Sequence, residues 1–236
     1  AKNKEKIKNK KIDEGSLEEN KNPSGMTKQF YWFIGIMLFF VILFLAMTTV
    51  LQNLKTFDYR GMSFTKVKYG DTYFYQYDYY FKNERGGVTK YYLNLQVDPR
   101  QNNVSVDGNI DFRKGEFIYL SINETGLKEC KYGEAAVGAL AGFLAGNDIK
   151  AIAAVPNDAE AEQRGVKYAS CEASPLPGRI VILLEQGNET KITKENNCHR
   201  IQISNCELFP AVEKFMVQAL IDSQDSGSSN QTNSLV

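Results

Sequence analysis

The sequence predicts an α+β protein with an N-terminal transmembrane helix, then an antiparallel β-meander, then a mixed α/β half that ends in a C-terminal helix. Three observations support this fold class. A long apolar run lies near the N-terminus of the 236-residue chain, short segments after it alternate between apolar and polar side chains, and helix and strand patterns alternate toward the C-terminus. A chain of this length allows one or two domains.

The apolar run covers residues 30–51 and reads FYWFIGIMLFFVILFLAMTTVL, without a charge or a proline. As a helix it spans roughly 33 Å, enough for a hydrocarbon core of about 30 Å, and Tyr31 and Trp32 lie where interfacial anchors are expected. A signal peptide, the alternative, has an apolar core of about 7–15 residues and a small-residue cleavage site. Leu45-Ala46-Met47 is a poor site of that kind. We therefore expect a permanent signal-anchor, with the lipid bilayer as its first partner.

The location of the C-terminal part is predicted from its cysteines and glycosylation sequons. Lysines and arginines lie near both ends of the apolar run, so the positive-inside rule decides little. All four cysteines follow the run, and an even number suits disulfides in an exported domain. Four Asn-x-Ser/Thr sequons lie in the same part, in expected turns or in the tail, at Asn103, Asn123, Asn188 and Asn230. We expect a single-pass glycoprotein of the cell membrane whose C-terminal domain is extracytoplasmic.

Composition divides the chain into five segments. A tail rich in lysine, asparagine and glutamate has little to bury and is predicted to be disordered in the cytoplasm, and a polar C-terminal tail is predicted to be disordered as well. The ordered part between them is large enough for a core of its own. The segments are the tail at 1–28, the transmembrane helix at 29–52, a juxtamembrane linker at 53–66, the extracytoplasmic α+β domain at 67–222 and the polar tail at 223–236.

The predicted strands and helices follow turn and capping signals. Turn residues at 83–87 separate two tyrosine-rich segments, and Pro99 ends the second because proline has no N–H to donate. The meander is predicted over residues 72–81, 88–97, 104–106, 110–112 and 117–122. In the second half, Asn157 is expected to cap a short helix. Helices are predicted at 134–144, 157–164 and 208–221, and strands at 149–155, 166–171 and 179–186, the last paired antiparallel with 199–204.

The cysteines are predicted to form structural disulfides. If residues 199–204 are extended, Cys198 and Cys206 lie about 25 Å apart, whereas a disulfide needs Cα atoms within about 7 Å. Bridges from Cys130 and Cys171 to these two cysteines remain, in either pairing. The alternatives, a metal site or a redox pair, lack support because the chain has no Cys-x-x-Cys and only one histidine, His199. We predict no metal site.

Catalytic signals are weak throughout the sequence. His199 follows Cys198 directly, but neighbours in a strand point to opposite faces, so an ordinary strand histidine is predicted. No phosphate loop, dinucleotide fingerprint, calcium loop or nucleophile elbow occurs, so no cofactor and no catalytic residue is assigned. Equal numbers of basic and acidic residues, 28 each, give no field that would attract nucleic acid. A carboxylate-dependent hydrolase or sugar-active enzyme remains the alternative to a binding protein.

A row of tyrosines is the most unusual feature. Tyr73, Tyr75, Tyr77 and Tyr79 alternate along one predicted strand and therefore share one face. Such a row can form a surface for a partner. It can equally be the half-buried face of a hairpin that packs on the rest of the domain.

The layout is similar to that of uncharacterised single-pass, membrane-anchored proteins of DPANN-type archaea. The resemblance covers most of residues 26–222 and rests on the tyrosine-rich strand and on short motifs. It implies the same placement at the membrane and no particular activity. Together with the residues, it leads us to expect a non-enzymatic cell-surface module that binds a membrane or envelope protein. The motifs are Asp98-Pro99-Arg100, Gly187-Asn188-Glu189-Thr190, Asn197-Cys198 and Asn205-Cys206.

Overall fold

The structure is a computed structural model that describes residues 24–53, 55–82, 86–112, 115–172 and 179–229. It confirms the α+β class. The chain divides into two compact units, residues 1–51 and 52–236. Most of the predicted N-terminal tail lies outside the described residues, so its disorder stays a prediction.

The first unit is built on helix α1 (Ser24–Asn53). Its segment Gln29–Val50 is long and apolar enough to cross a membrane, and none of its most apolar window is buried. Large side chains such as Phe30, Trp32 and Phe44 are each about two-thirds exposed in the structure, at 65%, 72% and 65%. A helix that is apolar on all sides needs either a lipid environment or a covering surface.

A four-stranded antiparallel sheet, here called the first sheet, follows α1. Residues 53–66, predicted as a linker, instead contain one strand and the larger part of the next one. The reason is an alternation that continues upstream of residue 67, with a tight turn at Arg60 and Gly61, both of which have positive φ. The strands, in spatial order, are β1 (Thr56–Tyr59), β2 (Met62–Tyr69), β3 (Thr72–Lys82) and β4 (Val88–Leu95).

A seven-stranded mixed sheet, here called the second sheet, contains the later strands of the described residues. The predicted five-strand meander is therefore wrong beyond its second strand. Residues 105–107 and 117–122 belong to this other sheet, where each segment pairs in parallel with other strands, and residues 110–112 form no strand. The spatial order is β5 (Ser105–Asp107), β10 (Lys191–Glu195), β11 (Cys198–Ile203), β9 (Ile180–Gln186), β6 (Phe117–Ile122), β7 (Lys150–Val155) and β8 (Lys167–Tyr168).

The pairing of β9 and β11 is also opposite to the prediction. These strands run parallel, and the antiparallel partner of β11 is β10, a strand that was not predicted from the sequence. A two-residue turn at Asn196 and Asn197 connects β10 to β11, and β11 lies between β10 and β9 in the sheet. The nearly continuous apolar run of β9 is typical of a parallel strand that is buried on both faces.

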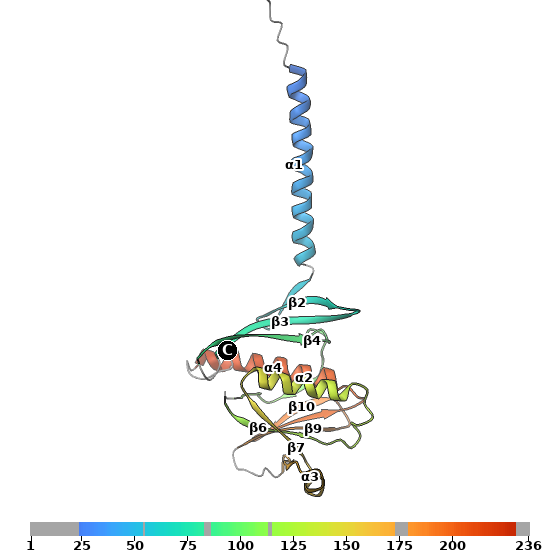
Figure 1. Cartoon of the computed structure of the whole chain (residues 1–236), viewed down its shortest axis with the longest axis vertical. Helices are drawn as coiled ribbons and strands as arrows, with labels where there is room; N and C mark the ends of the chain where they lie inside the picture. Colours follow the sequence, from blue (N-terminus) through green and yellow to red (C-terminus); the bar gives the residue numbers. More distant parts are fainter. Residues whose placement is uncertain (1–23, 54, 83–85, 113–114, 173–178, 230–236) are drawn as a thin grey trace, which may run out of the picture. The chain divides into compact units, whose positions relative to one another are not determined.

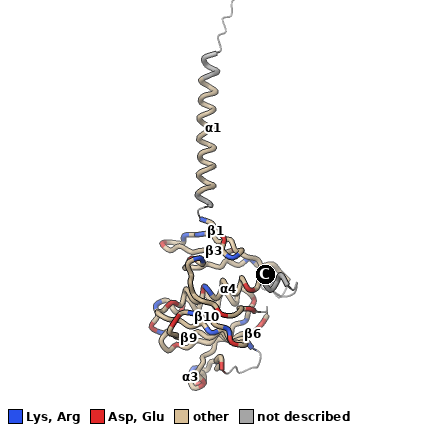
Figure 2. The backbone as a smooth tube through the Cα atoms, turned by 180° about the vertical axis from the view of Figure 1, so that it is seen from behind, with Lys and Arg blue, Asp and Glu red and all other residues tan. Residues whose placement is uncertain are grey.

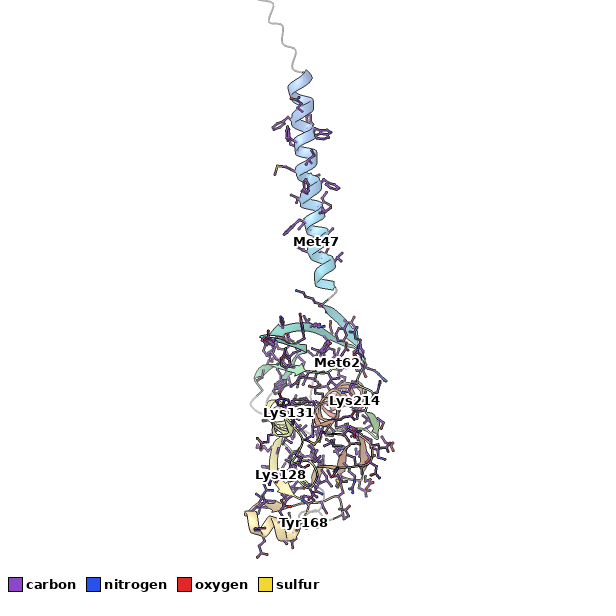
Figure 3. The ribbon with its side chains drawn as sticks, turned by 90° about the vertical axis from the view of Figure 1, so that its right-hand side faces the viewer. Met47, Met62, Lys128, Lys131, Tyr168 and Lys214 are labelled. Carbon is purple, nitrogen blue, oxygen red and sulfur yellow. A yellow bond between two sulfur atoms is a disulfide. The ribbon has the colours of Figure 1, made fainter. Side chains whose placement is uncertain are left out.

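Two helices lie between the sheets (Figure 1). They are α2 (Gly133–Gly146) and α4 (Leu208–Ser229), and their apolar side chains form the main core together with the inner faces of both sheets. The fully buried Met62 lies between the first sheet and this helix layer (Figure 3). Helix α4 continues through residues 223–229, which were predicted to be a disordered tail. The short helix α3 (Asp158–Arg164) connects β7 and β8 and is capped by Asn157 as predicted.

Candidate functional site

All four cysteines are paired. Cys130 is bonded to Cys206 and Cys171 to Cys198, with Cα atoms 5.2 Å and 5.3 Å apart. This is one of the two pairings that the sequence left open. The first bridge joins the loop before α2 to the loop before α4, and the second ties the chain after β8 to the start of β11. Disulfides persist in oxidising compartments, so an apolar N-terminal helix followed by two of them is typical of a secreted or extracytoplasmic domain.

The tyrosine row of β3 lies on the face that packs on the helices. Tyr79 is buried, and its hydroxyl donates a hydrogen bond of 2.8 Å to Oδ1 of Asn147 at the end of α2. Tyr75 and Tyr77 are half-buried beside the same core, and only Tyr73 is well exposed. Packing, the second interpretation of this row, therefore accounts for three of its four members. The row as a whole is not free to contact a partner.

The opposite face of the first sheet carries a different set of exposed aromatic side chains. The ammonium group of Lys90 lies 4.6 Å from the ring centroid of Tyr92 and 5.8 Å from that of Tyr80, and it pairs with Asp78 at 3.0 Å. Tyr69 meets Phe74 edge to face. We call this surface the tyrosine–lysine face and define it by Tyr69, Phe74, Tyr80, Val88, Lys90 and Tyr92, all exposed except the half-buried Phe74.

This face was not predicted from the sequence, and the reason is structural. Its members come from three strands and form two groups. The register of β3 and β4 places Tyr80 opposite Lys90 and Asp78 opposite Tyr92, whereas Tyr69 and Phe74 meet near the other end of β3. Within β3 itself, Tyr80 is the only tyrosine outside the row of four. The sequence signal for this face is Tyr80 together with Tyr92, because a hairpin register between the two strands places both side chains on one face of the sheet.

A small polar pocket of about 210 Å³ lies at the amino ends of β6, β9 and β11. His199 contributes to its wall and is almost completely buried. The imidazole ring of His199 fits between Phe112 and Phe215, with ring centroids 5.4 Å and 5.7 Å away. Its Nδ1 atom has no hydrogen-bond partner among the described residues. The pocket is lined by Asp111, Glu116, Ile180, Lys194, Asn196, Asn197 and His199.

Burial sets the protonation of this pocket. It lowers the pKa of His199 to about 4, and the ammonium of Lys194 acts in the same direction. Burial acts to raise the pKa of Asp111, but the ion pair with Lys194 outweighs it and holds that pKa below its usual value. The histidine is thus neutral and the aspartate ionised near neutral pH. Cys198 points to the other face of the sheet into its disulfide, as strand alternation predicted.

Replacing His199 with phenylalanine is expected to make the domain less sensitive to acid. A histidine whose folded pKa is about 4 and whose ordinary pKa is 6.5 contributes stability above pH 6.5, and that stability is lost as pH falls toward 4. The full loss corresponds to about 3 kcal/mol. Chemical unfolding at pH values between these two should show that the free energy of unfolding of the wild type falls relative to that of the variant as pH falls. A pH-independent difference would contradict the assignment, and His199→Gln, which also cannot titrate, serves as the control.

The predicted glycosylation sites differ in accessibility. Asn103 and Asn188 are exposed. Asn123 is half-buried, and its Oδ1 accepts a hydrogen bond from the backbone N–H of Thr125. Asn230 lies outside the described residues. Glycosylation stays a prediction at all four positions.

No protein-family model, curated protein or solved structure matches this chain. The resemblance to archaeal single-pass proteins therefore stays a prediction. Within the part of the chain that the structure describes, no group of three or more His, Cys, Asp and Glu side chains is placed to hold a metal ion.

Proposed function

We propose that this chain is a single-pass membrane protein whose disulfide-bonded domain lies outside the cytoplasm as a non-enzymatic binding or envelope-assembly module. One combination of features carries the proposal, namely an apolar helix of membrane-spanning length followed by a domain whose four cysteines are all paired. The cytosol keeps thiols reduced, so two structural disulfides favour an exported domain. The 22-residue span exceeds the apolar core of an ordinary signal peptide, about 7–15 residues, which favours an anchor that is retained.

The tyrosine–lysine face is the surface best suited to binding. Tyrosine supplies a large apolar ring with a polar end, and aromatic residues are enriched where proteins meet partners. Here three tyrosines and a valine are exposed on one sheet face, with exposed fractions from 49% for Tyr92 to 66% for Val88. Exposed apolar side chains that gather on one face are typical of interaction sites.

The alternative function, a carboxylate-dependent hydrolase or sugar-active enzyme, has one observation in its favour. The polar pocket is lined by two carboxylates, Asp111 and Glu116. A general acid of such an enzyme needs a carboxyl group with a raised pKa, whereas the pKa of Asp111 is lowered by its ion pair with Lys194. Asp111 therefore does not fit the role of the general acid, although an ionised carboxylate fits that of the nucleophile or base, and we keep the binding function as the first proposal. Glycoside hydrolysis that is abolished by Asp111→Asn would reverse the preference.

The placement is tested on the full chain in its native envelope. We expect it to stay in the membrane pellet after alkaline carbonate extraction and to retain its N-terminal helix in an intact-mass measurement. External protease should digest the domain in right-side-out vesicles, and non-reduced peptide mapping should recover both bridges. A chain that is released without its N-terminal helix contradicts the anchor, and free thiols with protection from protease contradict the extracytoplasmic location.

A further inference from the structure

We infer that the tyrosine–lysine face of the first sheet docks on the anionic phospholipid headgroups of the membrane that holds the anchor. This inference rests on the proposed function, because it needs a retained helix. It names the partner of the exposed face as a lipid surface, and three independent features of the chain support it. They are the chemistry of the exposed side chains, the distribution of charge and the length of the tether.

The exposed side chains are of the types that reside at a membrane surface. Tyr69, Tyr80 and Tyr92 are 57%, 59% and 49% exposed. A tyrosine ring can lie among the headgroups with its hydroxyl in contact with water or phosphate, and for this reason tyrosine is enriched at both membrane interfaces. Lys90 lies over two of these rings and places an ammonium group within the same face. Asp78 lies on the same face and pairs with this ammonium at 3.0 Å, so phosphate must compete with a carboxylate for the cation.

The charge of the domain is divided unevenly between its two sheets. Residues 55–95, which include the first sheet, contain seven Lys and Arg against four Asp and Glu, a net charge of +3. Two of the lysines, Lys66 and Lys68, lie over Tyr73 and Tyr75, on the opposite face of the sheet from the tyrosine–lysine face. Residues 96–222 contain 13 basic residues against 18 acidic ones, a net charge of −5. Figure 2 shows basic and acidic positions on both sheets. An anionic membrane surface attracts the first part and repels the second, so it favours contact through the first sheet.

The short link between α1 and β1 allows even a weak contact with the membrane to form. In sequence, only Leu54 and Lys55 separate the end of α1 at Asn53 from the start of β1 at Thr56. A link this short holds the first sheet at a high effective concentration of headgroups, and intramolecular contacts then form without a high intrinsic affinity. A protein partner would have to displace this contact to use the same face.

Hydroxyl-radical footprinting of the full chain in nanodiscs tests the inference, because tyrosine side chains report their own access to water. Nanodiscs of phosphatidylcholine alone are compared with nanodiscs that also contain phosphatidylglycerol, at low and high salt. Tyr132 is an internal control, since it is 63% exposed and lies just before α2, outside the first sheet. The ammonium group of Lys131 lies over its ring, so the two residues form a similar tyrosine–lysine pair. In the anionic nanodiscs at low salt, Tyr69, Tyr80 and Tyr92 are expected to lose most of their labelling while Tyr132 keeps its own.

Charge reversal provides the matched variants. Lys90→Glu should restore labelling of Tyr80 and Tyr92 in anionic nanodiscs, whereas Lys131→Glu should leave them protected; disulfide mapping verifies that both variants fold. Equal labelling of the three tyrosines and Tyr132 in every lipid, with the chain still embedded, overturns the docking inference and leaves the anchor intact. Loss of the helix or release by carbonate overturns the anchor instead. Protection that occurs only in native membranes, and in no nanodisc, assigns the face to a protein and also overturns the inference.

Discussion

Replacing Cys130 and Cys206 together with alanine is expected to lower the free energy of unfolding by about 4.5 kcal/mol in the loop-entropy model. The two cysteines are 76 residues apart in sequence, so their bridge closes the longer of the two disulfide loops. Without it, the unfolded chain regains the freedom of that loop, and the loops before α2 and α4 are no longer joined. The measurement is denaturant unfolding of the full chain in detergent, followed by circular dichroism.

The second disulfide is the matched control for this prediction. Cys171 and Cys198 are 27 residues apart, so replacing both with alanine should cost less, about 3.5 kcal/mol in the same model. The expected order, with the longer loop more costly, follows from chain entropy alone. A larger loss from the shorter loop would show that packing around Cys198, in the smaller core on the outer face of the second sheet, outweighs the entropy of loop closure.

Replacing Glu213 with glutamine is expected to remove a loss of stability that the wild type shows as pH rises toward neutral. The Glu213 side chain is buried in α4, and its two oxygens accept hydrogen bonds from the backbone N–H groups of Gln96 and Val97, at 2.6 Å and 2.9 Å. Burial raises the pKa of Glu213 from 4.5 to about 7, although both hydrogen bonds act to lower it. The carboxyl group therefore stays largely protonated in the folded chain at pH values where it is ionised in the unfolded chain.

The direction of the pH effect follows from these two pKa values. A group whose folded pKa is raised contributes stability below pH 4.5, and that contribution is lost as pH rises to about 7. The full loss is about 3 kcal/mol. Glutamine does not titrate and keeps one acceptor oxygen for the end of β4. The difference in unfolding free energy between wild type and Glu213→Gln should thus change by this amount between the two pH values, and a constant difference would contradict the prediction.

Local features of the fold were predictable from the sequence. The apolar run, the cap at Asn157 and the apolar strand that is now β9 each depend on neighbouring residues. The stop of β4 was predicted from Pro99, and the strand ends within a few residues of it. Such features are encoded in short windows of sequence, where capping, proline geometry and side-chain alternation operate.

Features that depend on distant residues were not predictable in the same way. β10 is short and polar, and it is a strand because β11 and β5 provide hydrogen-bonding edges on both sides. Residues 223–229 read as a polar tail, yet they continue the helix that begins at Leu208. The burial of Tyr79 depends on Asn147, which is 68 residues away. The candidate sites have the same limit, since the pocket around His199 and the tyrosine–lysine face each combine residues from several strands.

The order of the cysteines along the chain has a consequence for biosynthesis. In an N-terminus-in protein, Cys130 and Cys171 reach the oxidising side before either of their partners, Cys206 and Cys198. The first two thiols available for oxidation are therefore not a native pair. A bridge formed between them during export must be reopened by attack of a later thiolate, through a mixed disulfide. With the proposed topology, we therefore expect cells that lack a disulfide isomerase to accumulate the chain with non-native bridges.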